Sequence, residues 1–462
     1  MAKVFQPDPN LANNCTLRYS TADGKLLNFN KNDFDADIES HTCQNGYGVI
    51  EFYNPVTWIS MHAFKDCSNL TSVTIPDGVT LIRPYAFKNC TNLTRVTIGN
   101  GVTSIREGAF EGCTSLMEIS IPDSVTKIGK NAFRECENLT CVRMGSGVES
   151  IGESAFFSER SSIDSVHISD LSAWCNIDFH DMCANPLGGN LYLDGVLVEE
   201  LTTITYNIKP YAFCHCGCLK KLIIPFYNSV ISIGECAFWG CTSLTEVDLT
   251  YSKLSKIDRG TFNGCKSLTN LKLPHYLTEI GECAFCGCTS LTDVTIPNGV
   301  IKIGSLAFGF CASLKDITIP NSVYSIGSSA FFRCTSLTDI VIPVERIEDR
   351  AFENCTWLRN VTIGDSVRTI GEEAFKGCNS IDLITIPASV YAIGDGAFSD
   401  SGCFRVYCKR TTPPFALNHN EHVNGIFNGT KPYLKIYVPR NSISAYKEGA
   451  IWKKYSSFIV EE

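Results

Sequence analysis

The chain has 462 residues, of which 44% are hydrophobic and 19% are charged, a balance typical of a folded protein rather than a disordered one. Its formal charge of −9 disfavours binding to duplex nucleic acid, which requires a basic surface. No apolar segment approaches the ~20 residues of a membrane-spanning helix, and the first residues, MAKVFQPDPN, lack the apolar region of a secretory signal, so we expect an intracellular or a processed protein.

Residues 1–55 do not share the pattern that fills most of the chain. Within them, Leu17–Phe29 is predicted to form a β-hairpin, because Asp23-Gly24 in its middle is a dipeptide typical of hairpin turns. We interpret this segment as an N-terminal cap that covers the first of the repeats that follow.

From residue 56 to residue 402 the motif Ala-Phe-x-x-Cys recurs in regular or slightly altered form. Successive phenylalanines are 21 to 25 residues apart, except for one interval of 57 between Phe156 and Phe213. Repeats of this length predict a solenoid, because each has too few apolar residues to fold alone. The repeat phenylalanines are Phe64, Phe87, Phe110, Phe133, Phe156, Phe213, Phe238, Phe262, Phe285, Phe308, Phe331, Phe352, Phe375 and Phe398.

One repeat, Cys90–Phe110, shows why the pattern predicts stacked strands. Val96 and Ile98 are apolar and lie on either side of a polar residue, which predicts a short strand with one buried face. Gly99–Gly101 then supplies a turn, and a second short apolar step leads to the phenylalanine. Stacked repeats would form a parallel sheet with ~4.8 Å between strands, and the phenylalanines would fill the opposite side of each coil.

Half of the 24 cysteines follow a repeat phenylalanine by three residues. A cysteine is small and mostly apolar, and its thiol is a weak hydrogen-bond donor. We therefore predict that these residues are reduced, pack in the core and contact a carbonyl group of the turn. They are Cys67, Cys90, Cys113, Cys136, Cys216, Cys241, Cys265, Cys288, Cys311, Cys334, Cys355 and Cys378.

The 57-residue interval contains an insertion at about 169–203. Ser161–Ile168 before it still fits a repeat strand, and Ile208–Phe213 after it resumes the register. The insertion holds Trp174 and a hairpin signal at Asp194-Gly195. We interpret it as a lateral excursion from one solenoid and not as a separate domain.

Directly after the insertion, Cys214, His215, Cys216 and Cys218 are residue types that bind zinc. In the repeat register Cys216 should point inward, whereas Cys214 and His215 occupy positions that are polar and solvent-facing in other repeats. Zinc requires a convergent tetrahedral set of ligands. We therefore predict no metal site here, and none at the similar stretch Cys283–Cys288.

Residues 403–462 depart from the repeat. They contain a Pro413-Pro414 turn, a predicted strand near Leu434–Val438 and a predicted helix from about Ser442 to Trp452, with Asn441 or Ser442 as its N-cap. We interpret them as a C-terminal cap.

Repeats such as CTSLTDVTIPNGVIKIGSLAF, Cys288–Phe308, resemble the BspA-like (treponemal) class of leucine-rich repeats over roughly Val56–Phe398. The insertion resembles one found in gut and oral Bacteroidetes members of this family. The resemblance implies a right-handed arc of the α/β leucine-rich-repeat type, with a parallel β-sheet on the concave face and short strands and turns on the convex face. It also implies a surface-associated protein that binds host or microbial partners without catalysis or a cofactor.

Residues that flank the buried positions of the repeat strands should point outward from the concave face. In the C-terminal half they form an acidic stripe interrupted by one lysine. This stripe is either a docking surface for a basic partner or a set of short polar residues that keeps an exposed sheet soluble. The candidate binding residues are Glu246, Asp248, Lys272, Asp293, Asp316 and Asp339.

The chain has no nucleophile-elbow, zinc-protease or Walker motif. We predict a monomeric, non-catalytic protein of the surface adhesin type that binds a protein or glycan through its concave face and insertion. An alternative is an intracellular or delivered interaction scaffold, because the chain has no apparent signal and many thiols. A minor alternative is a thiol- or metal-dependent enzyme.

Overall fold

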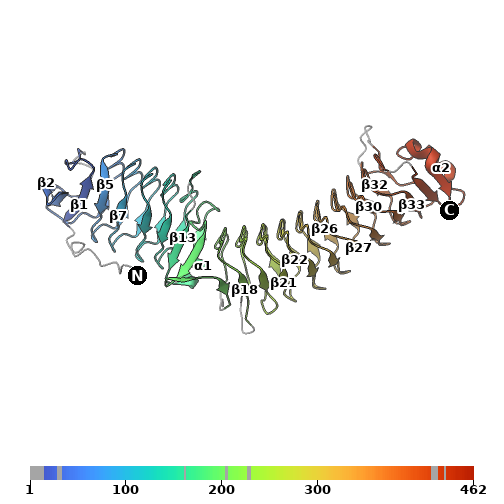
Figure 1. The fold of residues 1–462 in the computed structure, drawn as a ribbon, viewed down its shortest axis with the longest axis horizontal. Coiled ribbons are helices and arrows are strands. Elements are labelled where there is room, and N and C mark those ends of the chain that lie inside the picture. Colours follow the sequence, from blue (N-terminus) through green and yellow to red (C-terminus); the bar gives the residue numbers. More distant parts are fainter. Residues whose placement is uncertain are drawn as a thin grey trace. The chain divides into compact units, whose positions relative to one another are not determined.

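The computed structural model describes residues 15–28, 34–160, 163–202, 207–225, 230–417, 425–430 and 433–462. It has two compact units: unit 1 comprises residues 1–198 and 208–218, and unit 2 comprises residues 199–207 and 219–462. In each unit the chain winds into a β-solenoid whose successive turns lie side by side (Figure 1). The predicted repeat solenoid is confirmed.

Each regular turn contributes a longer and a shorter strand, which stack into two separate parallel ladders. We call the surface of the longer strands the long-strand face; it is the face that the sequence predicts to be concave. In unit 1 its strands are β5 (Leu70–Thr74), β7 (Arg95–Thr97), β9 (Glu118–Ser120), β11 (Cys141–Arg143), β13 (Ser165–Ile168) and β15 (Asn190–Leu193). The two-residue strands of unit 1 are β4 (Trp58–Ile59), β6 (Leu81–Ile82), β8 (Ser104–Ile105), β10 (Lys127–Ile128), β12 (Ser150–Ile151) and β14 (Asp178–Phe179).

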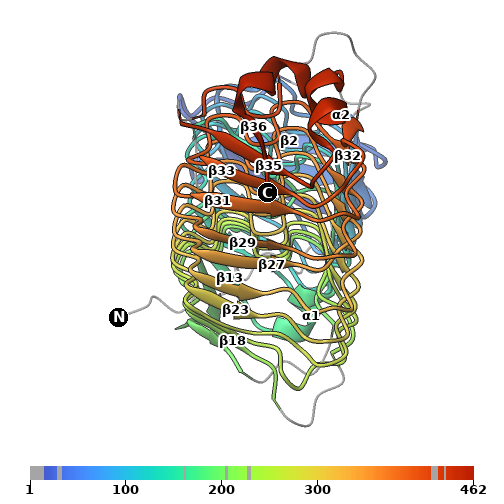
Figure 2. The same ribbon diagram turned by 90° about the vertical axis from the view of Figure 1, so that its right-hand side faces the viewer.

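Unit 2 has the same two ladders, and Figure 2 shows several of its long strands running parallel, one after another. The long-strand face is formed by β17 (Glu200–Leu201), β18 (Lys221–Ile223), β19 (Glu246–Asp248), β21 (Asn270–Lys272), β23 (Asp293–Thr295), β25 (Asp316–Thr318), β27 (Asp339–Ile342), β29 (Asn360–Ile363), β31 (Leu383–Ile386), β33 (Arg405–Cys408), β35 (Lys435–Val438) and β36 (Ile459–Glu461). The short strands are β20 (Lys256–Ile257), β22 (Glu279–Ile280), β24 (Lys302–Ile303), β26 (Ser325–Ile326), β28 (Arg346–Ile347), β30 (Thr369–Ile370), β32 (Ala392–Ile393) and β34 (Phe415–Ala416).

The repeat phenylalanines form continuous stacks inside the turns. From Phe64 to Phe156 in unit 1, and from Phe238 to Phe398 in unit 2, each ring lies nearly parallel to the next, with 5.1–5.6 Å between ring centroids. Rings at this distance are offset-stacked, a favourable aromatic geometry. The stacks therefore hold each turn in register with its neighbours.

The repeat cysteines bind successive turns together by hydrogen bonds. In nine of the twelve, the thiol lies 3.0–3.3 Å from the carbonyl oxygen of the repeat phenylalanine in the preceding turn; one example is Cys311 Sγ to Phe285 O, 3.2 Å. All 24 cysteines are free thiols. Burial raises the pKa of Cys136, Cys311 and Cys355 to about 12, so these thiols stay protonated donors. The predicted contact with a turn carbonyl is confirmed.

The N-terminal segment is a sheet extension rather than the hairpin predicted over Leu17–Phe29, of which the structure describes residues 17–28. Strand β1 (Thr16–Thr21) pairs antiparallel with β5 on one side and with β3 (Tyr47–Phe52) on the other. The hairpin joins β3 to β2 (Ile38–Gln44) through Asn45-Gly46, both with positive φ. That dipeptide is an equally strong turn signal, and the edge of β5 determines that β1 pairs with it.

Residues 169–203, interpreted from the sequence as a lateral excursion, include a full turn of the solenoid. Helix α1 (Leu171–Cys175) leads to β14, which pairs with β12, and β15 pairs with β13. Buried Ala184 and Leu187 occupy the turn between β14 and β15. The turn contains no Ala-Phe pair, so the spacing of phenylalanines does not reveal it. The predicted hairpin at Asp194-Gly195 is confirmed, because it joins β15 to antiparallel β16 (Val196–Leu197).

Solenoid geometry continues in unit 2 beyond residue 402, where the sequence predicts that the repeat ends. Strand β33 pairs with β31, β34 pairs with β32, and Phe427 stacks on Phe398 with 5.5 Å between ring centroids. The predicted strand near Leu434–Val438 is present as β35, and the predicted helix is present but shorter, as α2 (Ile443–Glu448), followed by a 3₁₀ helix at Lys453–Phe458.

Candidate functional site

The long-strand face of unit 2 brings the six predicted binding residues into two adjacent columns. Parallel pairing aligns the first outward residue of each strand with its equivalent on the next, as in Lys221 with Glu246 and Asp293 with Asp316. The second column aligns Asp248 with Lys272. These columns are the ones that the repeat register predicts.

Three of the six residues form ion pairs within the face itself. Asp248 accepts a hydrogen bond from Lys272 at 2.8 Å and from Thr250, and these contacts lower the pKa of its carboxyl group against the opposing effect of burial. Glu246 lies 3.9 Å from the amine of Lys221 and accepts a hydrogen bond from Asn270 at 3.0 Å. Lysine side chains of the same face therefore neutralise Glu246 and Asp248, so these two residues are not free acidic groups.

Asp293, Asp316 and Asp339 form the remaining, exposed part of the stripe. Within the described residues, none of the three is in an ion pair with a lysine or arginine. Asp293 accepts a hydrogen bond from Thr292 at 2.9 Å, and Asp339 accepts bonds from Thr338 and Asn360. The last two contacts lower the pKa of Asp339, which keeps it ionised at neutral pH.

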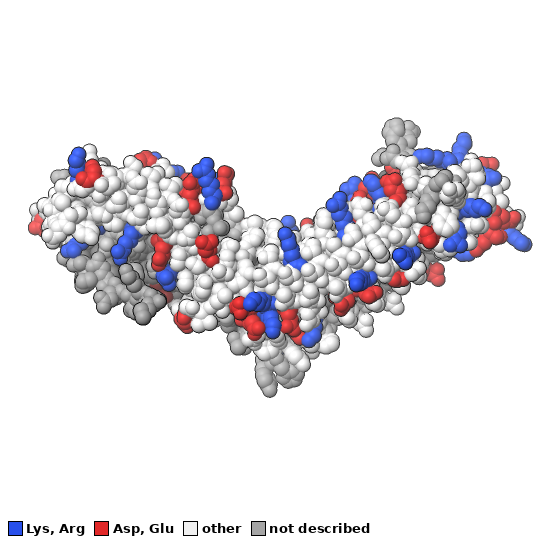
Figure 3. All heavy atoms as spheres, in the orientation of Figure 1, with Lys and Arg blue, Asp and Glu red and all other residues white. Residues whose placement is uncertain are grey.

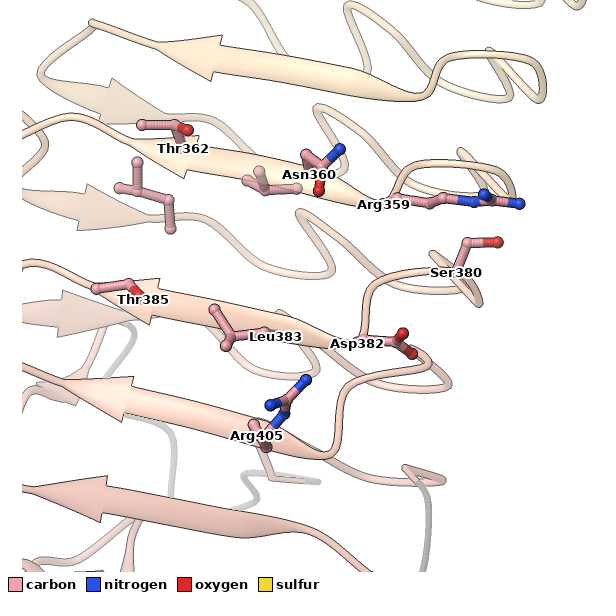
Figure 4. A pocket seen from close by; sticks show the side chains of 10 residues that line it. Arg359, Asn360, Thr362, Ser380, Asp382, Leu383, Thr385 and Arg405 are labelled. Carbon is pink, nitrogen blue, oxygen red and sulfur yellow. The ribbon is translucent and has the colours of Figure 1, made fainter. Parts of the chain in front are cut away.

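A cavity opens beside this stripe, at one of the three places where strand pairing in the long-strand ladder of unit 2 is interrupted. Strands β27 and β29 form one sheet and β31 begins another, and the cavity of about 880 Å³ lies across this break. Its polar lining comes from consecutive strands and the segments before them, as Figure 4 shows. The labelled side chains there are Arg359, Asn360, Thr362, Ser380, Asp382, Leu383, Thr385 and Arg405.

The two arginines of the cavity each lie over an aromatic ring. The guanidinium carbon of Arg405 is 4.9 Å from the ring centroid of Phe404, and that of Arg359 is 5.8 Å from the ring of Trp357. Such cation–π contacts orient the guanidinium group without neutralising it. Sequence reasoning missed Arg405 because it placed the end of the repeat before β33; extending the outward column by one strand would have included it.

Charged side chains of both signs are interspersed on the side of the molecule seen in Figure 3, without a large patch of one sign. The side of the molecule seen in this view therefore lacks the extended basic surface that nucleic acid binding requires.

The cysteine-rich stretch at Cys214–Cys218 is mostly buried, and the sulfur atoms of Cys216 and Cys218 lie 3.6 Å apart. Cys214 is 1% exposed and Cys218 is 7% exposed, so the expectation that Cys214 faces solvent is wrong; only His215 is exposed. The Cys218 thiol donates to Val198 O at 3.3 Å, and its sulfur accepts from Leu191 N–H at 3.4 Å. These contacts satisfy backbone groups of the irregular β15–β16 turn, which regular repeats lack. No cluster of three or more metal-ligating side chains occurs within the described ranges.

Helices in the described part of the chain are too short or too polar to cross a bilayer.

Comparisons with known proteins agree with this architecture. The family model for the BspA type leucine rich repeat region matches residues 49–181, 206–338, 302–413 and 325–443. A solved leucine-rich repeat protein from Bacteroides ovatus is 23% identical and aligns over 89% of both chains with a TM-score of 0.50. A leucine rich cell surface protein from Faecalibacterium prausnitzii is 26% identical over 88% of both chains, with a TM-score of 0.35. No curated protein matches the chain.

The matched segments cover most of the chain and coincide with the two ladders, the phenylalanine stacks and the cysteine contacts described above. The chain belongs to the BspA-type leucine-rich repeat family.

Proposed function

We propose that the chain is a non-catalytic binding protein, and that the long-strand face of unit 2 docks a basic segment of a protein partner. The observation that supports this proposal is a run of three exposed carboxylates at the equivalent position of successive turns, Asp293, Asp316 and Asp339, none of which forms an ion pair in the described structure.

This arrangement is unfavourable for the isolated fold. Like charges directly opposite each other on paired strands destabilise a sheet, and Asp293 is aligned with Asp316 in the parallel register. Elsewhere on the same face, opposite charges alternate, as in Asp248 with Lys272. Solubility alone would be served equally by such mixed pairs. A lysine- or arginine-rich partner segment would supply the missing cations, and exposed Val341 and Leu383 add apolar contact area nearby.

The test is affinity capture of binding partners from host and bacterial extracts by the full chain. The double variant Asp316→Lys/Asp339→Lys should lose its captured basic partner. The matched control, Glu345→Lys/Asp365→Lys, makes the same charge change at exposed residues outside these columns and should capture as the parent does. If the stripe variant retained every partner, the docking proposal would fail.

A glycan ligand is a second candidate, supported by the cavity at β29–β33. Amide, hydroxyl and guanidinium groups line it, and the stacked rings of Tyr407 and Tyr437, 4.6 Å apart, lie on the same face. Arg405→Ala should abolish binding to an immobilised glycan panel if this candidate holds, whereas Lys447→Ala on α2 should not. Unchanged glycan binding by Arg405→Ala would exclude the cavity.

We also propose a surface-associated location, as the family resemblance implies. The alternative, an intracellular or delivered scaffold, is supported by 24 free thiols, because reduced cysteines persist in reducing compartments. Fractionation of the producing cell, with impermeant maleimide labelling of exposed Cys43 on intact cells, separates the two. Labelling supports the surface, and labelling only after lysis supports the interior.

A further inference from the structure

The N-terminal end of the long-strand face in unit 1 contains a small basic cavity, because the charged residues that line it are arginines. It has a volume of about 200 Å³ and is lined by Arg18, Tyr47, Ser72, Val73, Thr74, Arg95 and Thr97. None of these side chains is acidic. The cavity lies in unit 1 and is separate from the docking face proposed above for unit 2.

The backbone register places the two arginines on either side of one strand. Strand β1 pairs antiparallel with β5, which sets Arg18 opposite Thr74, and β7 pairs parallel with β5, which sets Arg95 opposite Ser72. Leu17 and Tyr19 are buried, so Arg18 between them projects from the other side of β1, toward the face. The N-terminal sheet extension therefore does more than cover the first turn: it adds a cation to the face.

Neither arginine is neutralised within the described structure. No carboxylate lies within ion-pair distance of either, and the Nε atom of Arg18 is buried without a hydrogen-bond partner. Glu51 on β3 lies two residues from the position opposite Arg18 and accepts a hydrogen bond from Ser40 at 2.8 Å. Glu118, which follows Arg95 in the repeat register, is bonded to Nε of Arg143 at 2.9 Å. A buried donor of a charged group that lacks an acceptor costs free energy, which an oxygen ligand would recover.

We infer that this cavity is a binding site for an oxoanion, a carboxylate or sulfate group carried by a small polar ligand. Guanidinium groups bind such groups through paired N–H donors. The hydroxyl groups of Ser72, Thr74 and Thr97 can donate to the same oxygens or to hydroxyl groups of the ligand. The volume exceeds that of a bare anion and suits a group the size of one acidic sugar residue.

The experiment is calorimetric titration of the full chain with sulfate, glucuronate and glucose at constant ionic strength. We expect saturable 1:1 binding of at least one anion and none of glucose. Tighter binding of glucuronate than of sulfate assigns the site to an acidic sugar, and the reverse assigns it to a sulfate group. Absence of saturable binding by both anions overturns the inference.

Matched variants locate the binding. Arg95→Gln removes an exposed side chain and should not disturb folding, and it should weaken anion binding about tenfold or more, as loss of a charged hydrogen bond predicts. Arg18→Gln should do the same. Arg106→Gln makes an equal charge change at an exposed residue outside the cavity and should leave affinity unchanged. Equal affinities of Arg95→Gln and Arg106→Gln overturn the inference.

The acidic-stripe variant Asp316→Lys/Asp339→Lys should bind the anion normally, so this inference and the docking proposal can fail independently of each other.

Discussion

The interior of the turns and the long-strand face share one repeat register but differ in how freely their residues vary. Inside the regular turns, a phenylalanine stacks on a phenylalanine, and in nine of them a cysteine bonds to the turn before it. Outside, one column of unit 2 passes from Lys221 through Glu246 and Asp293 to Arg405. An interior residue must fit copies of itself on both sides, whereas an outer residue meets solvent. The repeated interior residues thus build the scaffold, and the variable outer residues are the ones that can determine which partner binds.

The largest expected effect is on an interior ring. Phe308→Ala should lower the free energy of unfolding by about 3–5 kcal/mol, because it removes a fully buried ring from the middle of a stack. Phe310→Ala, in the same turn but 40% exposed, should cost no more than about 1 kcal/mol. Urea denaturation measures both, and equal losses would mean that the stack does not carry the stability.

The next effect concerns the interior thiols in alkali. Because burial raises the pKa of Cys311 and Cys355 to about 12, the folded state holds these protons more tightly than the unfolded state does. The contribution of these thiols to the free energy of unfolding is complete below about pH 9. It is lost as the pH rises toward 12, by up to about 1.4 kcal/mol per pH unit for each thiol.

Cys311→Ser/Cys355→Ser should therefore flatten the loss of stability between pH 9 and pH 12 in reducing buffer. Cys43→Ser, at an exposed residue, is the control and should leave the slope as it is. An unchanged slope in the double variant would show that these thiols do not titrate on unfolding.

A smaller effect is expected on the face itself. Asp316→Asn should change the free energy of unfolding by no more than about 0.5 kcal/mol, with a slight gain favoured, because it relieves repulsion from Asp293. Ile317→Ala, one residue further and buried, should cost about 2–4 kcal/mol. A large loss from Asp316→Asn would assign the acidic stripe a structural role.

The last prediction concerns the chemical reactivity of Cys283 rather than stability. A hydrogen bond from the Cys286 thiol lowers the pKa of Cys283 to about 7, although partial burial opposes this shift. Iodoacetamide at pH 7.5 should therefore alkylate Cys283 before the interior thiols, and Cys286→Ala should slow the reaction. Peptide mass mapping gives the order of labelling, and preferential labelling of Cys311 would contradict the interior assignment.

The regular part of the fold was predictable because each repeat contains, within its own residues, the pattern that specifies its strand and its buried positions. Spacing of the Ala-Phe-x-x-Cys motif and the alternation around Val96 and Ile98 define both columns of the face to the residue. Turns without that motif were not predictable: Ala184 replaces the aromatic ring in one, and Phe427 continues the stack outside the motif in another.

Pairing on the face was only partly predictable. The columns place Asp248 beside Lys272, but whether two side chains bond depends on their rotamers, which the sequence pattern does not contain. The cavity beside Arg405 lies where β29 and β31 belong to different sheets, and no residue motif points to it. The basic cavity of unit 1 depends on β1, whose pairing with β5 was mistaken for a local hairpin.

The nine bonds from a repeat cysteine thiol to the phenylalanine carbonyl of the preceding turn each span only 24 to 27 residues of chain. The stacked rings and the thiol bonds described above thus join each regular turn to its direct neighbours. Under tension such a chain should not rupture at once but release its turns one after another. Each turn would add roughly 80 Å of contour length, from 23 residues of extended chain. If the chain is pulled between a bound partner and an attachment point, this stepwise lengthening would absorb mechanical work before the partner dissociates.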